Sequence, residues 1–306
     1  MEFFQSNSNI NFMGQRNKAF FFSILIAILA CSTLWIKGLN LGLDFTGGLQ
    51  IECTIKKDLS LSEFKNYWLQ AGFDEARLQS LGSSQHYIVK LPASYQAKWQ
   101  NKQSALKTSM PWVQWDQVSF IGPQVGKNLL SQAYMALLLS MVCTMIYIAI
   151  RFDYRFAISA AISLIHDPIL ILGVFSWFQM EFDLIVLAAL LTIIGYSLND
   201  TIVVYDRIRE NFATYQNLSP SEIVNRSINQ TLSRTIMTSG LTLLVVIALL
   251  LFGGHTLDGF AWALLLGILI GTYSSIYIAG SFSLVLGLSS NVFKPRYTKK
   301  QLDAIP

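Results

Sequence analysis

Charged side chains are scarce in this sequence. Asp, Glu, Lys and Arg make up 13% of its 306 residues, whereas hydrophobic residues make up 53%. A soluble domain of this length would need more polar surface, because charged groups normally cover the water-facing side of a protein. The composition therefore excludes a water-soluble globule and indicates that most of the chain lies against lipid or against other helices.

Cysteine and histidine are also rare, with three of each. Cys31 and Cys143 fall in long apolar runs and Cys53 falls in a polar segment, so no disulfide pair is evident and all three are interpreted as small apolar side chains. The sequence has no phosphate-binding loop and no nucleophile motif. We therefore predict no metal site, no cofactor and no catalytic residue, and we do not expect an enzyme.

Long apolar runs are the dominant pattern. A helix needs about 20 mostly apolar residues to cross a bilayer, and six runs qualify: 19–36, 130–150, 156–177, 184–205, 236–252 and 260–286. The last run is long enough to tilt or bend. The first continues past Cys31 to Ile36, which favours a retained span over a cleaved signal. A longer polar connection is expected over residues 206–233.

In the short loops, Lys and Arg lie on one side of the membrane only. They precede the first run, connect the second to the third and the fourth to the fifth, and follow the sixth: Arg16, Lys18, Arg151, Arg155, Arg207, Arg209, Arg226, Arg234, Lys294, Arg296, Lys299 and Lys300. Loops 179–183 and 253–258 contain neither residue type. Positive loops stay in the cytoplasm, so both termini are predicted inside and the large loop after the first run outside. This topology explains the net charge of +4, and no nucleic-acid partner is inferred.

The spans divide the chain into four predicted parts. These are a cytoplasmic N-terminus with transmembrane helix 1 over 1–36, an extracytoplasmic domain over 37–128, transmembrane helices 2–6 over 129–288, and a cytoplasmic tail over 289–306. In the second part, strands are predicted near 49–55, 77–81, 87–91 and 114–121, and helices near 61–72 and 95–108. The predicted fold class is a polytopic α-helical membrane protein with six transmembrane helices and one small β-α-β-β-α-β, ferredoxin-like α+β domain outside the membrane.

Ionisable groups inside the spans are few, and each is a functional hypothesis because a charge in lipid is costly. The third span carries His166 and Asp167 near its middle, followed by Pro168, which interrupts the helical hydrogen bonding. The fourth span carries Asp200 in its cytoplasmic third. Polar neighbours of Asp200 on the same span are Ser197, Asn199 and Thr201. An alternative reading of Asp200 is a solvated carboxylate at the membrane surface.

The fifth and sixth spans contain two further patterns. A polar stripe at three- and four-residue spacing, expected to face other helices, consists of Thr231, Arg234, Thr235, Thr238 and Thr242. The sixth span has small residues that let helix backbones approach closely, namely Gly267, Gly271 and Ser275. The alternatives are a positive-inside anchor for Arg234 and simple packing for the glycines.

Several local sequences occur together in this chain. They are LGLDFTGG at Leu41–Gly48, IGPQVGKNL at Ile121–Leu129, the pair His166-Asp167, GYSLNDTIVVYDRIREN at Gly195–Asn211, SRTIMTSG at Ser233–Gly240 and GTYSSIYIAG at Gly271–Gly280. As a set, they closely resemble the SecD/SecF family of protein-export membrane proteins, on its SecF side, over nearly the whole chain.

The resemblance implies half of a transporter of the resistance-nodulation-division (RND) superfamily in the bacterial cytoplasmic (inner) membrane, where it uses the proton motive force to assist protein export by the Sec pathway. The implied partners are SecD, which supplies a second set of helices, the SecYEG translocon with YajC as a further candidate, membrane lipid, and an unfolded exported polypeptide as substrate. Position by position, Asp200 matches the proton-linked carboxylate and Arg234 the basic residue paired with that pathway. Supporting polar groups are expected at His166, Asp167, Ser197, Asn199, Thr201, Thr235 and Thr238.

Glycines and a proline lie where the chain enters and leaves the outer domain. Candidate hinge or motif residues are Asp44, Gly47, Gly48, Gly122, Pro123 and Gly126, with ordinary turns as the alternative. Three other functions compete with the implied one. A proton-driven exporter of small molecules would need a larger outer pocket. A membrane aspartyl protease would need Asp167 and Asp200 at one depth, and a passive scaffold would not need Asp200.

Overall fold

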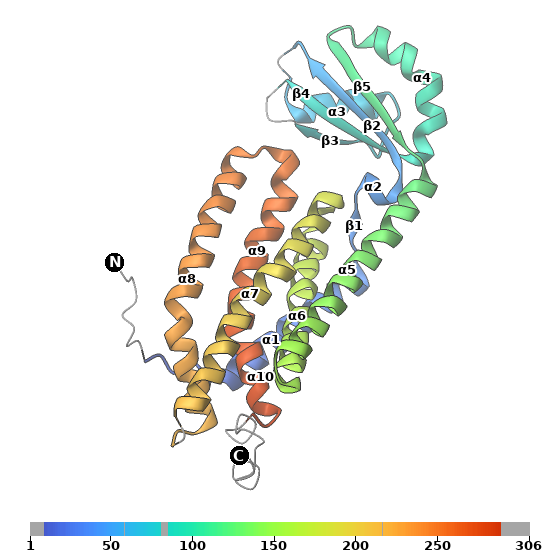
Figure 1. Cartoon of the computed structure of the whole chain (residues 1–306). Coiled ribbons are helices and arrows are strands. Elements are labelled where there is room, and N and C mark those ends of the chain that lie inside the picture. Colours follow the sequence, from blue (N-terminus) through green and yellow to red (C-terminus); the bar gives the residue numbers. More distant parts are fainter. Residues whose placement is uncertain (1–8, 58, 81–84, 216, 289–306) are drawn as a thin grey trace, which may run out of the picture.

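The computed structural model describes residues 9–57, 59–80, 85–215 and 217–288. A bundle of long helices forms one part of the molecule, and a small sheet domain stands at one end of it (Figure 1). The predicted tail, 289–306, lies outside the described residues. The predicted fold class is confirmed at this level.

Six helical segments of the described chain are long and apolar enough to cross a membrane. The first five are α1 (Arg16–Ile36), α5 (Pro123–Arg151), α6 (Tyr154–Phe178), α7 (Leu184–Thr214) and α8 (Pro220–Phe252). The sixth is built from α9 (Asp258–Ser274), a π-helical turn (Ser275–Ala279) and α10 (Gly280–Val285). A one-turn helix, His255–Leu257, precedes α9, and another, Met13–Gln15, precedes α1.

The connection over residues 206–233, predicted to be long and polar, is mostly helical. α7 continues to Thr214, and α8 begins after Ser219, whose side chain forms a capping box with Glu222. Asn211 donates hydrogen bonds to Ser227 Oγ and Gln230 Oε1, both at 2.8 Å, and so joins the two extensions. A search for apolar runs finds only the lipid-length part of such helices and misses their polar ends.

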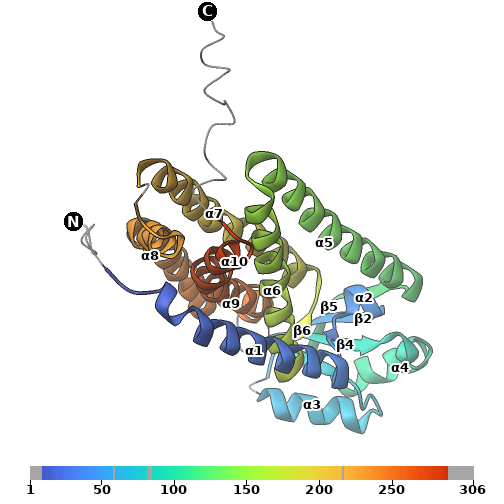
Figure 2. The ribbon, with the colours of Figure 1, turned by 90° about the horizontal axis from the view of Figure 1, so that it is seen from below.

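The helices are not equally buried. The most apolar stretch is 56% buried in α6, 50% in α7 and 50% in the last span, against 22% in α1, 11% in α5 and 17% in α8. Seen along the bundle, α6, α9 and α10 lie at the centre, and α1, α5 and α8 lie outside them (Figure 2); α7 packs against α9 and belongs with the half-buried helices. The inner helices therefore position the buried side chains, and the outer ones present their apolar surface to lipid or to a partner.

The sheet domain contains β2 (Gly48–Ile55), α3 (Leu61–Gln70), β3 (Arg77–Ser80), β4 (His86–Pro92), the turn Ala93–Tyr95, α4 (Gln96–Ser109) and β5 (Val113–Ile121). The strands pair antiparallel in the order β3-β4-β2-β5. The predicted β-α-β-β-α-β sequence of elements is confirmed.

Aromatic side chains fill the space between this sheet and its helices. Trp68 of α3 is fully buried and stacks on Trp99 of α4, with ring centroids 6.0 Å apart. The alternating burial of β2 places Ile51 and Cys53 in the same core. The opposite face of the sheet carries Gln50 and Lys90 and is turned toward the helical bundle.

A short connector that the sequence patterns did not predict links the two parts. Strand β1 (Asn40–Leu41) pairs in parallel with β6 (Glu181–Phe182), and α2 (Leu43–Thr46) packs against α5. A two-residue strand is too short to leave a periodic pattern. This connector fixes the chain to the outer end of α7 before it enters the sheet domain.

Candidate functional site

Buried polar side chains cross the centre of the otherwise apolar bundle. They come from α6, α7, α8 and the last span, and comprise Ser159, Ser163, Asp167, Ser197, Asp200, Thr201, Thr235, Ser239, Ser274 and Ser275. Polar groups in a lipid-facing protein are buried only where other polar groups satisfy them. Two clusters stand out in this set, one around Asp167 and one around Asp200; Ser159 bonds to Arg155 O, and Ser163 belongs to neither cluster.

Asp167 joins three helices. Its side chain is 2% exposed. Oδ2 accepts hydrogen bonds from Ser197 Oγ of α7 at 2.6 Å and from Ser274 Oγ of α9 at 2.8 Å. Oδ1 lies 3.0 Å from Nδ1 of the adjacent His166. Both carboxylate oxygens therefore have partners, and the group acts as a connection between α6, α7 and α9.

Asp200 belongs to a less complete cluster. The residue is 4% exposed, and its Oδ2 lies 3.5 Å from Ser239 Oγ of α8, at the long limit of a hydrogen bond. Ser239 Oγ also lies 2.9 Å from Thr272 Oγ1 of α9. The hydroxyl of Thr238, also on α8, acts on the same carboxylate. A buried carboxylate whose hydrogen bond is as long as the one to Ser239 is poorly compensated for lost water. Asp200 is therefore the buried acid that this conformation holds less firmly.

Arg234 and Asn199 lie at the edge of this cluster. Arg234 is exposed on α8. Among the described residues, Arg234 and Asp200 do not form an ion pair, and the charge of Arg234 acts on Asp200 from a greater distance. One position along α8 is about 100° around the helix, so buried Thr235 faces the bundle and Arg234 does not. Thr238 donates its hydroxyl hydrogen to Arg234 O at 3.1 Å. Asn199 is exposed on α7.

The small residues of the last span lie against α7. A Cβ added to Gly267 would stand 2.4 Å from Ile193 Cδ1, and one added to Gly271 would stand 3.0 Å from Ser197 Cβ. Thr201 Oγ1 and Ser275 Oγ are 3.0 Å apart. The π-helical turn begins at Ser275, and such turns are frequent at functional sites of helices. α7 and α9 therefore approach as closely as their backbones allow, next to both clusters.

The two points where the chain crosses into the sheet domain touch each other. Gly47 has φ 74° and Gly48 has φ 150°. A Cβ on Gly47 would stand 2.9 Å from Pro123 Cα, and one on Gly126 would stand 2.7 Å from Phe45 O. Gly122 caps α5 with an extended backbone. The two chain segments that connect the bundle to the sheet domain are in van der Waals contact at Gly47 and Gly126, and a larger side chain at either position would collide with the other segment.

Asp44 fixes the connector to the bundle. Its Oδ2 accepts a hydrogen bond from Leu184 N, at the first residue of α7, at 3.1 Å. The neighbouring Asp183 accepts one from Val186 N at 2.8 Å. Burial raises the pKa of Asp183 above its ordinary value, and the nearby charges of Glu181 and Asp44 add to the rise. The start of α7 is thus held by two carboxylates that repel each other.

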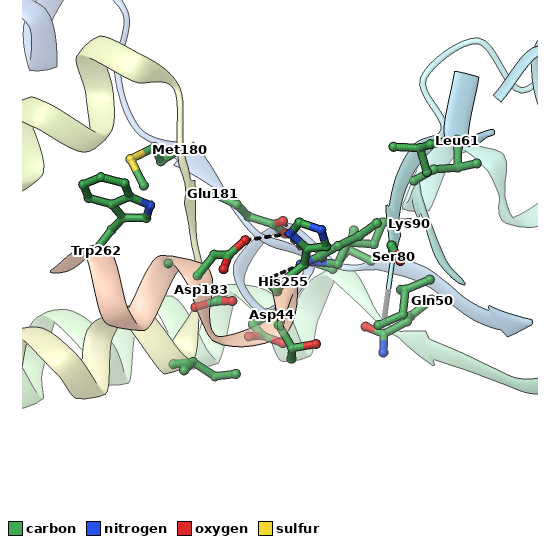
Figure 3. A pocket seen from close by; sticks show the side chains of 18 residues that line it. Asp44, Gln50, Leu61, Ser80, Lys90, Met180, Glu181, Asp183, His255 and Trp262 are labelled. Carbon is green, nitrogen blue, oxygen red and sulfur yellow. Dashed lines mark hydrogen bonds and ion pairs between the residues drawn. The ribbon is translucent and has the colours of Figure 1, made fainter. Parts of the chain in front are cut away.

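A cleft of about 590 Å³ separates the polar face of the sheet from the outer end of the bundle (Figure 3). Lys90 of β4 spans it to form an ion pair with Glu181 at 2.8 Å. Gln79 of β3 donates to His255 O at 2.8 Å. These contacts couple the sheet domain to the loops that precede α7 and α9. Among the described residues, no three His, Cys, Asp or Glu side chains gather to hold a metal ion.

Sequence reasoning did not single out several of these residues. Ser239 lies four positions after Thr235, so the same helical spacing that marked the α8 stripe would have found it. Thr272 lies within the glycine- and serine-rich segment of the last span but carried no signal of its own. Lys90 and Glu181 are 91 positions apart, and no local pattern links them.

Comparisons with protein families place most of the chain in one family. Residues 101–289 match the family model "Protein export membrane protein SecD/SecF, C-terminal". Residues 33–54 match "SecD/SecF GG Motif", and this range includes Gly47 and Gly48.

Individual relatives match along almost their full length. The chain is 43% identical over 302 residues to the protein translocase subunit SecF of Vibrio alginolyticus, covering 97% of this chain and 96% of the relative. It is 42% identical over 299 residues to the same subunit of Pseudomonas aeruginosa, covering 97% and 98%.

Two solved structures are similar in fold. The crystal structure of SecDF, a translocon-associated membrane protein from Thermus thermophilus, matches with a TM-score of 0.80 and 36% identity. A second SecDF crystal structure, in a super-membrane-facing form, matches with a TM-score of 0.72 and 37% identity. Each match covers 92% of this chain and 39% of the SecDF chain, so the present chain corresponds to about two-fifths of those molecules.

Proposed function

This chain belongs to the SecD/SecF family of protein-export membrane proteins, and we propose that it is the SecF-type subunit of a SecD–SecF complex that uses the proton gradient to assist protein export across the bacterial cytoplasmic membrane. The observation that carries the proposal is Asp200, an acid buried among α7, α8 and α9 with a long hydrogen bond. The proposed role is that of a proton-driven transport subunit without catalytic residues or a cofactor.

A partner bundle, which we assign to SecD, is needed to complete the membrane part. Asn199 is exposed within a span of this chain, where a polar group that faces lipid is costly, and Arg234 is exposed on α8 at the cytoplasmic side of the fifth apolar run. Gly195 of α7 and Gly240 of α8 have open space around them, and small residues of this kind favour close helix contact. A SecD bundle against α7 and α8 would satisfy these polar groups and fill this space.

Protonation of Asp200 would bias the packing of α8. In its neutral form, the acid tolerates the long contact with Ser239. In its ionised form, it would be stabilised by Arg234 if α8 turned that side chain inward. Two protonation states would then favour two helix arrangements, as a coupled switch requires. One proton crossing about 150 mV releases roughly 3.5 kcal/mol, enough to bias a two-state equilibrium about 300-fold.

The connector offers a route from this switch to the outer domain. α7 begins beside Asp183, and Leu184 N bonds to Asp44 of the connector. A displacement of α7 would therefore reach the glycine-lined crossings at Gly47 and Gly126. We propose that both termini and the loop after α7 lie in the cytoplasm, and that the sheet domain acts outside on an unfolded polypeptide, with SecYEG and YajC as neighbours. β5 is an edge strand of the sheet and is a candidate surface for backbone pairing.

The test is export into inverted membrane vesicles after ATP-dependent insertion, with and without a proton gradient. Asp200→Asn mimics the protonated acid but cannot cycle, so it should abolish the gradient-dependent part of export while the complex still assembles. Asp206→Asn is the matched control, because Asp206 lies on the same helix in a surface ion pair with Arg151. Arg234→Met should also inactivate, and the double variant should be no worse than either single variant.

Two results would reject this function. If Asp200→Asn vesicles respond to the gradient like wild type, the chain is a scaffold or the proton pathway lies elsewhere. If purification from the native membrane recovers a drug-export outer channel instead of SecD and translocon subunits, the chain belongs to a small-molecule exporter.

A further inference from the structure

Two buried polar atoms of α6 have no hydrogen-bond partner in the described part of the chain. They are Ser163 Oγ and His166 Nε2, one helical turn apart. The His166 side chain is 10% exposed. Buried polar groups in proteins are nearly always paired, and each exception calls for a reason. His166 is also the histidine farthest inside the bundle, because His86 lies in β4 and His255 lies at the outer end of the last span.

The contacts of Asp167 determine where a proton can reside. Its Oδ2 already accepts hydrogens from Ser197 and Ser274, so a proton there would displace one of them. Oδ1 faces Nδ1 of His166 at 3.0 Å. When the imidazole is neutral and Nδ1–H donates to the carboxylate, Nε2 carries a lone pair. The pair can therefore accept one proton, at Nε2.

We propose that His166 and Asp167 form a second proton-binding pair, separate from Asp200, that controls the contact of α6 with α7 and α9. On uptake, an N–H bond forms at Nε2. The Nδ1 proton then stays as part of an imidazolium–carboxylate pair, or the Nδ1–H bond breaks as an O–H bond forms at Oδ1. In both cases the net charge of the pair changes from −1 to 0, and the two residues titrate as one unit. The inference rests on the proposed proton-coupled function and adds a second site to it.

The charge of Asp167 affects the two neighbouring helices directly. Hydrogen bonds to a carboxylate are roughly twice as strong as those to a neutral acceptor. Where the proton moves on to Oδ1, Asp167 becomes a neutral acceptor and the bonds from Ser197 and Ser274 weaken; where it stays on the imidazolium, the carboxylate remains charged and these bonds are kept. Ser197 lies three positions before Asp200 on α7, and Ser274 is the last residue of α9 before the π-helical turn. Transfer of the proton to Oδ1 would thus loosen α9 at the turn that also contacts Thr201.

Among the described residues, no ion pair joins His166 or Asp167 to a third residue. The contact between the two residues themselves joins His166 Nδ1 to Asp167 Oδ1 at 3.0 Å. In the apolar parts of the helices packed against α6, the titratable side chains are Cys31 on α1, Tyr134, Cys143 and Tyr147 on α5, Tyr196, Asp200 and Tyr205 on α7, and Tyr273 and Tyr277 on the last span. The ends of these helices carry Arg16, Lys18, Lys127, Arg151, Asp206, Arg207, Arg209, Glu210, His255 and Asp258. Tyr273 is already bonded to Ser23 and Ala19 O of α1. The buried carboxylate among them is Asp200, which bonds to a different set of hydroxyls.

The first experiment measures protonation directly. The full chain is labelled with ¹⁵N-histidine and reconstituted with unlabelled SecD in lipid vesicles, so that only its three imidazole rings are observed, and His166→Gln assigns the signals of one of them. We expect the His166 signal to show the Nδ1–H tautomer at high pH and to gain a proton at Nε2 as the pH is lowered, a transition that Asp167→Asn abolishes. His86 and His255 are internal references. A His166 signal that remains neutral from about pH 4 to 9 overturns the proposal.

The second experiment measures coupling. His166→Gln keeps a side chain that can bond to Asp167 but cannot take up a proton, so gradient-driven export should fall at least tenfold while gradient-independent export and SecD recovery stay at wild-type levels. His255→Gln is the matched control, because His255 is exposed at the outer end of the last span, and it should change neither mode of export.

The outcomes separate the second site from the proposed function. Equal losses in both export modes, or a wild-type gradient response of His166→Gln, reject the pair. If Asp200→Asn also responds like wild type, the proposed function itself fails. If His166→Gln responds to the gradient like wild type but Asp200→Asn does not, the proposal of a second proton-binding pair fails and the proposed function stands.

Discussion

The contact between Gly267 of α9 and Ile193 of α7 offers a direct test of how closely the central helices pack. A Cβ on Gly267 would lie 2.4 Å from Cδ1, 2.5 Å from Cγ1 and 2.7 Å from Cγ2 of Ile193. Carbon atoms in contact are normally about 3.5–4.0 Å apart, so Gly267→Ala requires a shift of about 1 Å. Ile193 is 1% exposed and has little room to yield.

The size of the effect follows from two opposing contributions. Overpacking a buried contact costs about 1–3 kcal/mol, whereas replacing glycine by alanine inside a helix returns about 1 kcal/mol. We therefore expect Gly267→Ala to lower the free energy of unfolding by about 0–2 kcal/mol. Gly195→Ala is the matched control, because nothing lies within 4 Å of its added Cβ, and it should be stabilising by up to about 1 kcal/mol. The difference between the variants, about 1–3 kcal/mol, isolates the packing cost.

The assay is reversible unfolding of the chain in mixed detergent micelles without SecD, so that the surface proposed for SecD at Gly195 stays free in every variant. Ile193→Ala removes all three clashing atoms and by itself costs about 2–5 kcal/mol. In the double variant, Gly267→Ala should cost less than it does alone, with a coupling energy of about 1–3 kcal/mol. If Gly267→Ala is as stable as Gly195→Ala and shows no coupling to Ile193, α7 and α9 do not pack as described.

Two further predictions concern the outer domain and its attachment. In a background with Cys31 and Cys143 changed to Ala, a membrane-impermeant maleimide should label Ser104→Cys in intact cells but not Asn217→Cys. Native Cys53 should stay unlabelled, since burial and the charge of Asp116 raise its thiol pKa to about 12; labelling of Asn217→Cys would refute the topology. Burial and the charges of Glu181 and Asp44 raise the pKa of Asp183 above its ordinary 3.8. Above this raised pKa, the ionised side chain lowers the free energy of unfolding. This loss of stability disappears as the pH falls toward 3.8, because Asp183 is then protonated in the folded protein. Asp183→Asn, which keeps the helix cap, should therefore melt at a higher temperature than wild type at about pH 8, and the advantage should vanish near pH 4; an equal advantage at both pH values would contradict this.

The spans and the outer domain could be predicted because their signals are local. Apolar length identifies a span from one stretch of chain, and the alternation from Leu49 to Ile55 identifies β2 in the same way. The sequence did not predict that α7 continues to Thr214 or that α8 begins at Pro220, because polar helix extensions lack an apolar run. The π-helical turn at Ser275 was also missed, since nothing in the spacing of small residues separates it from an ordinary helix.

The candidate site was predicted in composition but not in connectivity. His166, Asp167, Ser197 and Asp200 stood out because polar residues are rare in spans. Their pairing depends on how the helices rotate against each other, which a single sequence does not specify. The family resemblance suggested that Arg234 accompanies Asp200, but the rotation of α8 places Ser239 within hydrogen-bond distance instead.

The arrangement of the two clusters indicates which helices can move against each other. α7 contributes Ser197 to one cluster and Asp200 to the other, and α9 likewise contributes Ser274 and Thr272. Because Gly267 leaves no space against Ile193, α7 and α9 cannot slide independently and respond to both clusters as one unit. α8 is different: its most apolar stretch is 17% buried, and its hydrogen bond to Asp200 is 3.5 Å long. A change in the charge of Asp200 therefore acts on the weakly held contact between α7 and α8, so we expect the α7–α9 pair, which is bonded to the connector through Leu184 N, to move as one unit relative to α8.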